Sequence, residues 1–420
     1  MKKHFLKAGA LMYAIFIMLI TLIVIGSIIT IAFHHRNYME RELARQNLVS
    51  YTQSVLTAVL CDSTLSFPWD GTSLNLTENP NYTFLVTKER WGGYYIVSIT
   101  GKYGNYQLQK KALCGTKGVL NDGAALYLND NNNALSISGN TQLIGDCYLP
   151  KAGIKASYME GDYYRGKKLV YGDILVSGNV LPTIDEEYLT YVGGLLQGKL
   201  MKTDSILDFS SITTSEFYNP FYNKTLYLVS KEPLFLNRCK FTGNIAIISS
   251  QPVTIFPTAE LTDVMVIAPK IIFKKEWVGY LQAYARDTIL LEQDVRLQFP
   301  STIGVESTKN LGLIELNRGV RVDGNIWMTK NSKEKENKNS CSFFPETLVH
   351  GITQIEGKLS VGGKIYGSVY VEKFIYKTVS SYYENHLYNV EINAKARSPF
   401  YASAALNKKR GCNLIKMLEP

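Results

Sequence analysis

The chain has 420 residues, of which 46% are hydrophobic and 19% charged, and its net charge is +9. At roughly 150 residues per domain this length allows two or three modules or one long repetitive domain, and the apolar content excludes a disordered chain. Lys2, Lys3 and Lys7 carry three of the excess charges, and the remaining +6 is too dilute to indicate a nucleic-acid partner.

The amino-acid usage favours strands over helices. The chain contains 28 Tyr, 17 Phe and 32 Gly, together with many Val, Ile and Thr. Aromatic and β-branched side chains pack well on a pleated sheet. We therefore expect a mainly β protein in which long helices are confined to the N-terminus.

A run of 26 residues without a charge extends from Ala8 to Phe33. About 20 apolar residues already cross the hydrocarbon core of a bilayer, whereas a cleaved secretory signal has an apolar region of only about 7 to 15 residues. A buried core helix is the other alternative, but such a helix rarely lacks a polar face over this length. The sequence therefore predicts a cytoplasmic tail and transmembrane helix over residues 1–36.

The orientation of this helix follows from the charges on its two sides. Lys2, Lys3 and Lys7 precede the span, and an equal number of Arg residues follows between positions 36 and 45. The amino group of the chain adds one positive charge to the N-terminal side, which favours a cytoplasmic N-terminus. We expect the bulk of the chain to be extracytoplasmic, in the periplasm or at the cell surface.

Residues 37–60 have the pattern of an amphipathic stalk helix. Apolar residues recur at intervals of three to five, with charged residues between them, and no Pro or Gly separates this segment from the membrane span. The predicted stripe consists of Leu48, Tyr51, Val55 and Val59. Two alternatives remain for what covers it: the globular part of the same chain, or the helices of other subunits.

The N-terminus resembles that of minor pilins and minor pseudopilins. The likeness lies in the short basic tail, the Gly-Ala step within residues 7–11, the continuous membrane-to-stalk helix and the segment 45–48. In that family a peptidase cuts after the Gly and the helix then packs into a pilus or pseudopilus. The resemblance implies that Gly9 and Ala10 form a processing site and that the stripe contacts neighbouring helices. Two positions depart from the family pattern: Ala10 stands where Phe or Met is usual, and Ala14 where Glu is usual.

The body of the chain contains two regions with different residue patterns. Residues 61–118 predict a small antiparallel module, with a strand over 91–100, a turn over 101–104 and a partner strand over 105–109. Residues 119–397 consist of short apolar or alternating runs separated by Gly, Asn, Asp and Pro. A sandwich, a meander or a β-helix could use such strands.

Two repeated features favour an irregular right-handed parallel β-helix for this solenoid-like domain. The segment 291–297 repeats its apolar positions and its Val-Arg step in 316–322, at an offset of 25 residues. A Gly-Asn pair recurs before apolar runs, and both residues tolerate the left-handed conformation of a tight corner. The four pairs begin at Gly139, Gly178, Gly243 and Gly324. The body also resembles β-helical scaffold proteins.

Two segments depart from this texture. Residues 330–340 contain no apolar side chain and mix both signs of charge, which predicts a disordered loop. Residues 398–420 include Lys408, Lys409 and Arg410 and predict a basic C-terminal tail.

The sequence assigns no catalytic, cofactor-binding or metal-binding residue, and it predicts that the chain has no cofactor. Its six Cys residues contain no C-x-x-C pair, and its five His residues are dispersed. Cys114 with Cys147 is the candidate disulfide, and buried unpaired thiols are the alternative. An enzymatic role would need clustered charged residues on one outward ladder. The candidates for such a role are Arg286 with Asp287, Asp294 with Arg296, and Asp323.

These observations predict a membrane-anchored extracytoplasmic protein with a structural or assembly role in the cell envelope, with pilin- or pseudopilin-like character. Its expected partners are the membrane and other envelope or pilus-like subunits, reached through the N-terminal helix. The alternatives are an anchored carbohydrate-binding or carbohydrate-cleaving β-helix and an adhesin-like module. A groove with clustered aromatic and acidic residues would favour sugars, and an exposed apolar edge would favour assembly.

Overall fold

The computed structural model describes most of the chain as two compact units. The described residues are 8–61, 71–74, 80–116, 124–199, 205–212, 214–331, 334, 336–404 and 412–419. The first unit comprises the chain up to Val59 with residues 71–87 and 99–110, and the second comprises the remainder. The expected class, a long N-terminal helix followed by a β-rich body, is confirmed.

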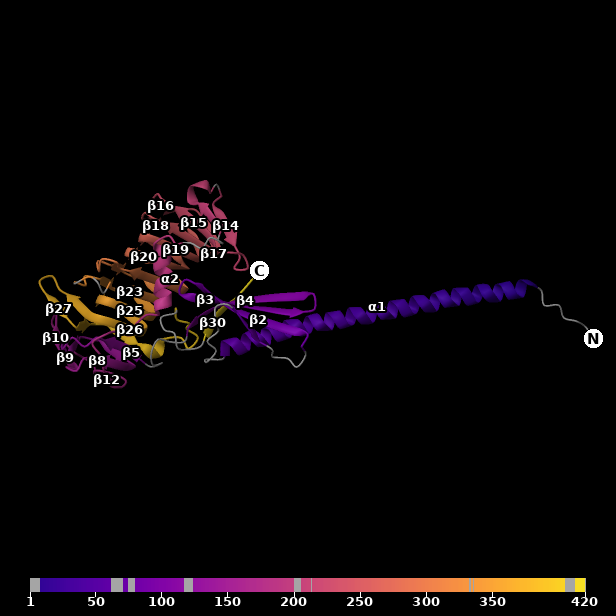
Figure 1. The fold of residues 1–420 in the computed structure, drawn as a ribbon. Coiled ribbons are helices and arrows are strands. Elements are labelled where there is room, and N and C mark those ends of the chain that lie inside the picture. The colour runs from indigo at the N-terminus through magenta and orange to yellow at the C-terminus, as the bar shows by residue number, and fades with distance from the viewer. Residues whose placement is uncertain are drawn as a thin grey trace, which may run out of the picture. The chain divides into compact units, whose positions relative to one another are not determined.

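Helix α1 (Ala8–Cys61) is one uninterrupted helix of 54 residues (Figure 1). At 1.5 Å per residue it is about 80 Å long. It contains no Pro, and a Cβ at either of its glycines, Gly9 or Gly26, would meet nothing within 4 Å. Nothing therefore breaks the ladder of backbone hydrogen bonds between the apolar half and the amphipathic half, as the sequence predicts.

A five-stranded sheet has the strand order β1-β2-β3-β4-β30. Two-residue turns join its three long strands, and both turns use glycine with positive φ: Gly92 (60°) and Gly104 (53°). The expected strand 91–100 is therefore displaced, because Trp91 ends one strand and Tyr94 begins the next. The bounds of the strands are β1 Thr72–Leu74, β2 Tyr82–Trp91, β3 Tyr94–Tyr103, β4 Tyr106–Thr116 and β30 Cys412–Leu418.

Most of the second unit is a stack of parallel strands, hereafter the parallel stack (Figure 1). Successive turns of the chain pair in parallel and in register, as in Leu291 with Leu316 and Arg296 with Arg321. The repeat between 291–297 and 316–322 therefore marks two adjacent turns. The strands of the main run are β13 Ser205–Asp208, β14 Glu216–Asn219, β15 Leu226–Ser230, β16 Leu234–Leu236, β17 Lys240–Ser249, β18 Val253–Ile255, β19 Glu260–Phe273, β20 Val278–Leu291, β21 Arg296–Glu306, β22 Leu313–Leu316, β23 Arg321–Thr329, β24 Ser340–Phe343, β25 Leu348–Val361, β26 Lys364–Lys377, β28 His386–Tyr388 and β29 Glu391–Asn393. The short strand β27 Tyr382–Glu384 pairs antiparallel with β26 and is not part of this run.

The strands that come first along the chain lie at the far end of this stack. β26 pairs in parallel with β5, β5 with β8, and β8 with β12. The chain then passes through α2 (Glu186–Leu196) and begins the opposite end of the stack at β13. The last strands of the parallel stack thus come from a segment that precedes the rest of it in sequence. The strands of that segment are β5 Ala124–Leu128, β6 Leu135–Ser138, β7 Gln142–Ile144, β8 Asp146–Leu149, β9 Ile154–Ala156, β10 Tyr158–Met159, β11 Asp162–Tyr163 and β12 Ile174–Val176.

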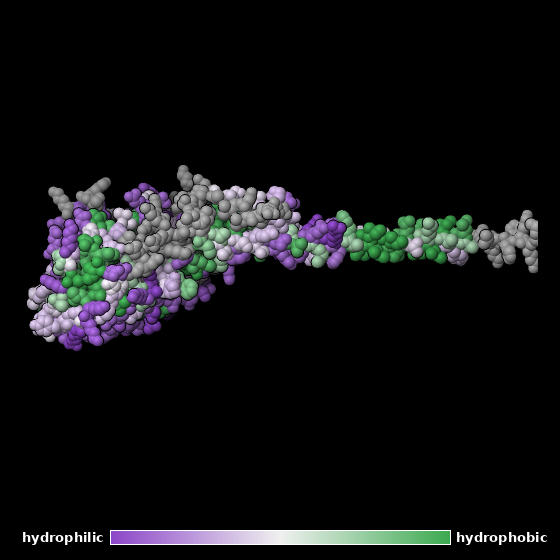
Figure 2. All heavy atoms as spheres, turned by 90° about the horizontal axis from the view of Figure 1, so that it is seen from below, coloured by the Kyte–Doolittle hydropathy of each residue, from purple (hydrophilic) through white to green (hydrophobic). Residues whose placement is uncertain are grey.

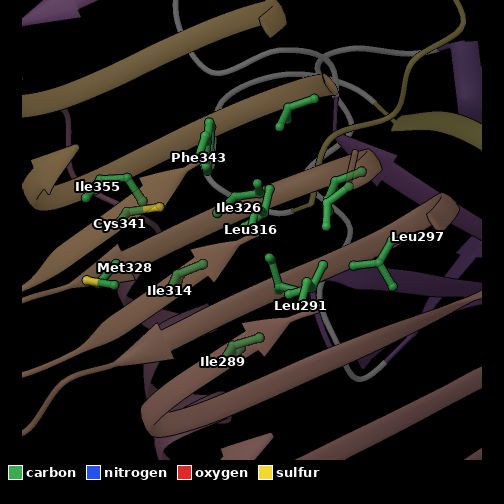
Figure 3. Packing of buried hydrophobic residues seen from close by; sticks show 14 of the residues in the cluster. Ile289, Leu291, Leu297, Ile314, Leu316, Ile326, Met328, Cys341, Phe343 and Ile355 are labelled. Carbon is green, nitrogen blue, oxygen red and sulfur yellow. The ribbon is translucent and has the colours of Figure 1, made fainter. Parts of the chain in front are cut away.

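The interior of the stack is filled by columns of like side chains, one from each turn (Figure 3). Ile289, Ile314 and Cys341 follow one another in register, and each is fully buried. Each fully buried aliphatic side chain of this kind contributes about 1.5 to 3 kcal/mol. A second column contains Leu291, Leu316, Phe343 and Val361.

Helix α2 was not expected from the strand-rich texture of this region. Asp185 caps it, because its Oδ1 accepts from the backbone N–H of Glu187 at 3.0 Å. The buried Tyr188 hydroxyl donates to Tyr284 and accepts from Trp327 Nε1, both at 3.0 Å. These contacts build a second apolar cluster outside the interior of the stack.

The Gly-Asn pairs do not all form the expected corners. Gly139 and Gly243 have positive φ, 62° and 98°, whereas Gly178 and Gly324 do not. Gly243 and Gly324 lie inside the long strands β17 and β23. The chain therefore bends within these strands and not before them. What the glycines of the bend have in common is close backbone packing: a Cβ on Gly324 would lie 1.9 Å from Ser301 O.

Two segments that the sequence assigns to a loop and a tail contain ordered contacts. Within 330–340 the described residue Asn339 is fully buried, and its side-chain amide donates to Thr329 O at 3.0 Å. Within 398–420 strand β30 pairs antiparallel with β4. Residues 332, 333 and 335 of the loop, and the basic run 408–410 of the tail, lie outside the described residues.

Candidate functional site

The first half of α1 exposes its apolar side chains. The large hydrophobic residues exposed between Leu11 and Phe33 have 45% to 76% of their surface accessible. The hydroxyls of Ser27 and Thr30 are satisfied inside the helix, donating to the carbonyls of Ile23 and Gly26 at 2.8 Å. A helix that needs no water for its polar groups and presents apolar side chains all round is suited to lipid. By length and composition this helix can cross a membrane (Figure 2).

The predicted processing site lies at the beginning of this helix. Gly9 and Ala10 are exposed, in the first turn of α1. A Cβ on Gly9 would meet nothing within 4 Å. A side chain could therefore be added there without disturbing the described fold, and cleavage after Gly9 stays a prediction.

The second half of α1 packs on the strands of the first unit. Leu48, Val55 and Val59 are 2%, 0% and 4% exposed, and Tyr51 is half-buried. Leu48 Cδ1 lies 3.0 Å from the position that a Cβ on Gly101 of β3 would occupy. The predicted stripe is thus covered by the same chain, which was the first of its two alternatives.

Further contacts fix the same face of the helix to the sheet. The ring of Tyr51 meets that of Tyr82 edge to face, with 5.1 Å between centroids. Lys110 Nζ donates to Gln53 Oε1 at 2.8 Å. The buried face also includes Ala44, Thr52 and Leu56, which the sequence interpretation missed. The spacing 44-48-52-55-59 consists of steps of three and four residues and would have found Ala44 and Thr52.

A groove of about 580 Å³ lies on the outer face of the parallel stack. Outward-facing residues of β22, β24 and β25 form its floor: Glu315, Ser342 and Ser360 follow one another in register. Their neighbours Ser340 and Lys358 are also paired. The strand alternation that buries Cys341 and Leu359 points these polar side chains outwards.

The groove combines positive charge with aromatic side chains. Lys338, Lys358 and Lys377 line it, and among its lining residues Glu315 is the only carboxylate. Lys338 pairs with Glu336 at 2.9 Å, whereas no ion pair is formed by Lys358 or Lys377 among the described residues. A cleft lined by cations attracts an anionic ligand, and aromatic side chains supply apolar contact area for it. The lining aromatic residues outside the interior columns are Phe344, Tyr376 and Tyr382.

The candidate catalytic residues are not brought to this groove. None of Arg286, Asp287, Asp294, Arg296 and Asp323 lines it. Asp323 instead accepts from His350 Nδ1 at 2.5 Å and from Arg321 Nε at 3.3 Å. No three His, Cys, Asp or Glu side chains in the described part of the chain lie close enough to hold a metal ion.

The expected Cys114–Cys147 disulfide is wrong. Cys147 is a buried free thiol, whose S–H donates to Gly145 O at 3.6 Å. Burial raises its pKa to about 12, so the thiol stays protonated at neutral pH. This cysteine is therefore a packing residue of the stack.

No protein-family model matches the sequence, and no curated protein matches it. Among solved structures there is a similarity to the competence-associated pilin ComZ from Thermus thermophilus, with 10% identity over 89% of this chain and 96% of that chain. The TM-score is 0.28, which is too low to establish a common fold.

Proposed function

We propose that this chain is a membrane-anchored, extracytoplasmic structural or assembly protein of the cell envelope, built like a pilin or pseudopilin subunit. The observation that carries the proposal is α1, whose first half is exposed and apolar and whose second half packs on the strands of its own unit. This is the continuous membrane-to-stalk helix implied by the sequence resemblance. The N-terminus lies in the cytoplasm, and the parallel stack, an irregular parallel β-helix, lies outside.

Contacts with other subunits then fall on the part of α1 that its own strands leave open. Met39 and Leu43 are 55% and 61% exposed, and Val49 is 41% exposed. Met39 and Leu43 lie one helical turn apart beyond the apolar span, so a neighbouring helix could continue from the membrane along this part of the stalk.

Replacing Gly9 by Leu is expected to block processing. In cells that hold the matching peptidase, the mature wild-type chain should begin at Ala10, and the Gly9→Leu chain should keep residues 1–9. The physical reason is that a peptidase that requires glycine leaves no room for a branched side chain at the scissile bond. Intact-mass measurement of the purified chain reads the N-terminus directly.

The matched control is Gly26→Leu, because Gly26 lies in the same helix and is equally open. This variant should be processed like the wild type. A wild-type chain that still begins at Met1 would refute the pilin-like part of the proposal.

The orientation of the chain can be tested in the same cells. A membrane-impermeant maleimide should label the exposed Cys61 from outside, and labelling only after lysis would mean that the orientation is the reverse.

The groove favours a second candidate function, the binding of an acidic polysaccharide. Lys358→Glu reverses a charge on the groove floor and should weaken binding of a uronate polymer, measured by affinity electrophoresis of the full chain in detergent. The loss should shrink as salt is added, because screening weakens the contact with the wild-type chain. Lys151→Glu, at an exposed lysine that does not line the groove, is the control. Equal mobility shifts for both variants would exclude this function of the groove.

A further inference from the structure

The parallel stack ends on β12 without a further turn to cover it. Among the described residues β12 pairs only with β8, with Ile174 beside Cys147 and Val176 beside Leu149. Cys147 and Leu149 are buried core residues, so Ile174 and Val176 occupy inward positions of the coil. They are nevertheless 54% and 66% exposed. The core column of the stack is therefore open at this end.

The exposed surface extends beyond these two side chains. Leu175, on the outward side of β12, is 39% exposed, and Val180 just after the strand is 66% exposed. Figure 2 shows a contiguous hydrophobic patch on the side of the second unit seen from below, and in Figure 1 β12 lies at the bottom of that unit. An apolar edge strand with free backbone groups is a template for pairing with another strand.

The opposite end of the stack is open in the same way. In the described part of the chain β13 pairs only with β15, with Leu207 beside the fully buried Leu228. Leu207 is thus an inward residue as well, yet it is 42% exposed, and its neighbour Ile206 is 51% exposed. Both ends of the stack therefore expose the same inward column.

The two free edges are complementary. The ladders from β13 through the main run to β12 are parallel, so the free edge of β12 and the free edge of β13 face opposite ways along the stack. A second copy shifted along the stack axis would bring its β13 beside β12 of the first copy, with the same strand direction. Matching the inward positions sets Val176 beside Leu207 and Leu175 beside Ile206.

We propose that copies of this chain associate head to tail through these edges, β12 of one copy pairing in parallel with β13 of the next. The strand that pairs with the free edge belongs to a second copy, because this contact continues the ladder that already joins the turns within one chain. It keeps the same strand direction and the same column of inward side chains. Such a contact is heterologous and does not close, so it can propagate. It goes beyond the anchoring function and does not rest on the N-terminal helix.

Cysteine cross-linking between two variants tests this arrangement. One variant carries Leu175→Cys and the other Ile206→Cys, both with Cys61 and Cys412 replaced by Ser, and the full chains are kept in detergent micelles. Paired strands lie about 4.8 Å apart, which suits a disulfide. Mild oxidation should yield a cross-linked dimer in the mixture and none with either variant alone, and peptide mapping should identify the 175–206 bond.

Two further variants separate a specific contact from random collision. Adding Val176→Lys to the Leu175→Cys chain should abolish the cross-link, because a charge then enters the shared column. Val379→Lys is the matched control, since Val379 is fully exposed elsewhere, and it should leave the cross-link unchanged. Absence of a dimer in the mixture, or an equally strong dimer of Leu175→Cys alone, would overturn the head-to-tail contact.

Discussion

Replacing Val55 by Asp is expected to destabilise the first unit by about 3 to 5 kcal/mol, the usual effect of an unpaired charge in a buried position. Val55 is fully buried on the face of α1 that packs against β2 and β3, beside Leu48 and Thr52. The strands of this unit should then lose protection from hydrogen exchange. Mass spectrometry of the full chain in detergent should show faster exchange in peptides from 82–87 and 99–110.

The control for this variant is Val49→Asp, which makes the same chemical change on the same helix. Val49 is 41% exposed, so a carboxylate there remains hydrated and should change stability by less than about 1 kcal/mol. Peptides from the interior of the parallel stack, such as 264–268, should exchange at wild-type rates in both variants. Equal protection of 82–87 in Val55→Asp and Val49→Asp would contradict the packing of the stripe on its own strands.

Local patterns in the sequence are enough to predict α1 and the pairing of adjacent turns. The helix follows from a long apolar run joined to an amphipathic segment without Pro. The ladder between Leu291 and Leu316 follows from a repeat of apolar positions at constant spacing. In both cases the residues that determine the structure are close in sequence or repeat one another.

The order of the turns could not be predicted in this way. β5 pairs with β26, although Leu126 and Val369 are 243 residues apart in the chain. No sequence pattern marks this pairing, because every turn offers similar apolar columns and short parallel strands. The choice among them is made by the fit of whole turns, which periodicity does not measure.

The groove and helix α2 were not predicted from the sequence, for two different reasons. The floor of the groove joins Glu315, Ser342 and Ser360 from three turns of unequal length, so their proximity appears only once the register is known. Helix α2 had a local signal: Asp185 followed by two Glu residues is a typical N-terminal cap. The strand-rich surroundings outweighed that signal.

Replacing Gly351 by Ala is expected to destabilise the parallel stack by about 3 kcal/mol, at the upper end of the usual cost of overpacking. Ser301, Gly324, Gly351 and Gly367 pair in register, one from each of four turns. A Cβ on Gly351 would lie 1.9 Å from Gly324 O and 2.5 Å from the Tyr401 hydroxyl, so the ladder must separate to admit even one methyl group. Thermal unfolding of the full chain in detergent, followed by circular dichroism at a β-sheet wavelength, should show a lower midpoint.

Gly194→Ala is the control, because a Cβ there meets nothing within 4 Å and helix α2 should tolerate it within about 1 kcal/mol. A midpoint for Gly351→Ala equal to that of Gly194→Ala would mean that adjacent turns are farther apart than the register requires.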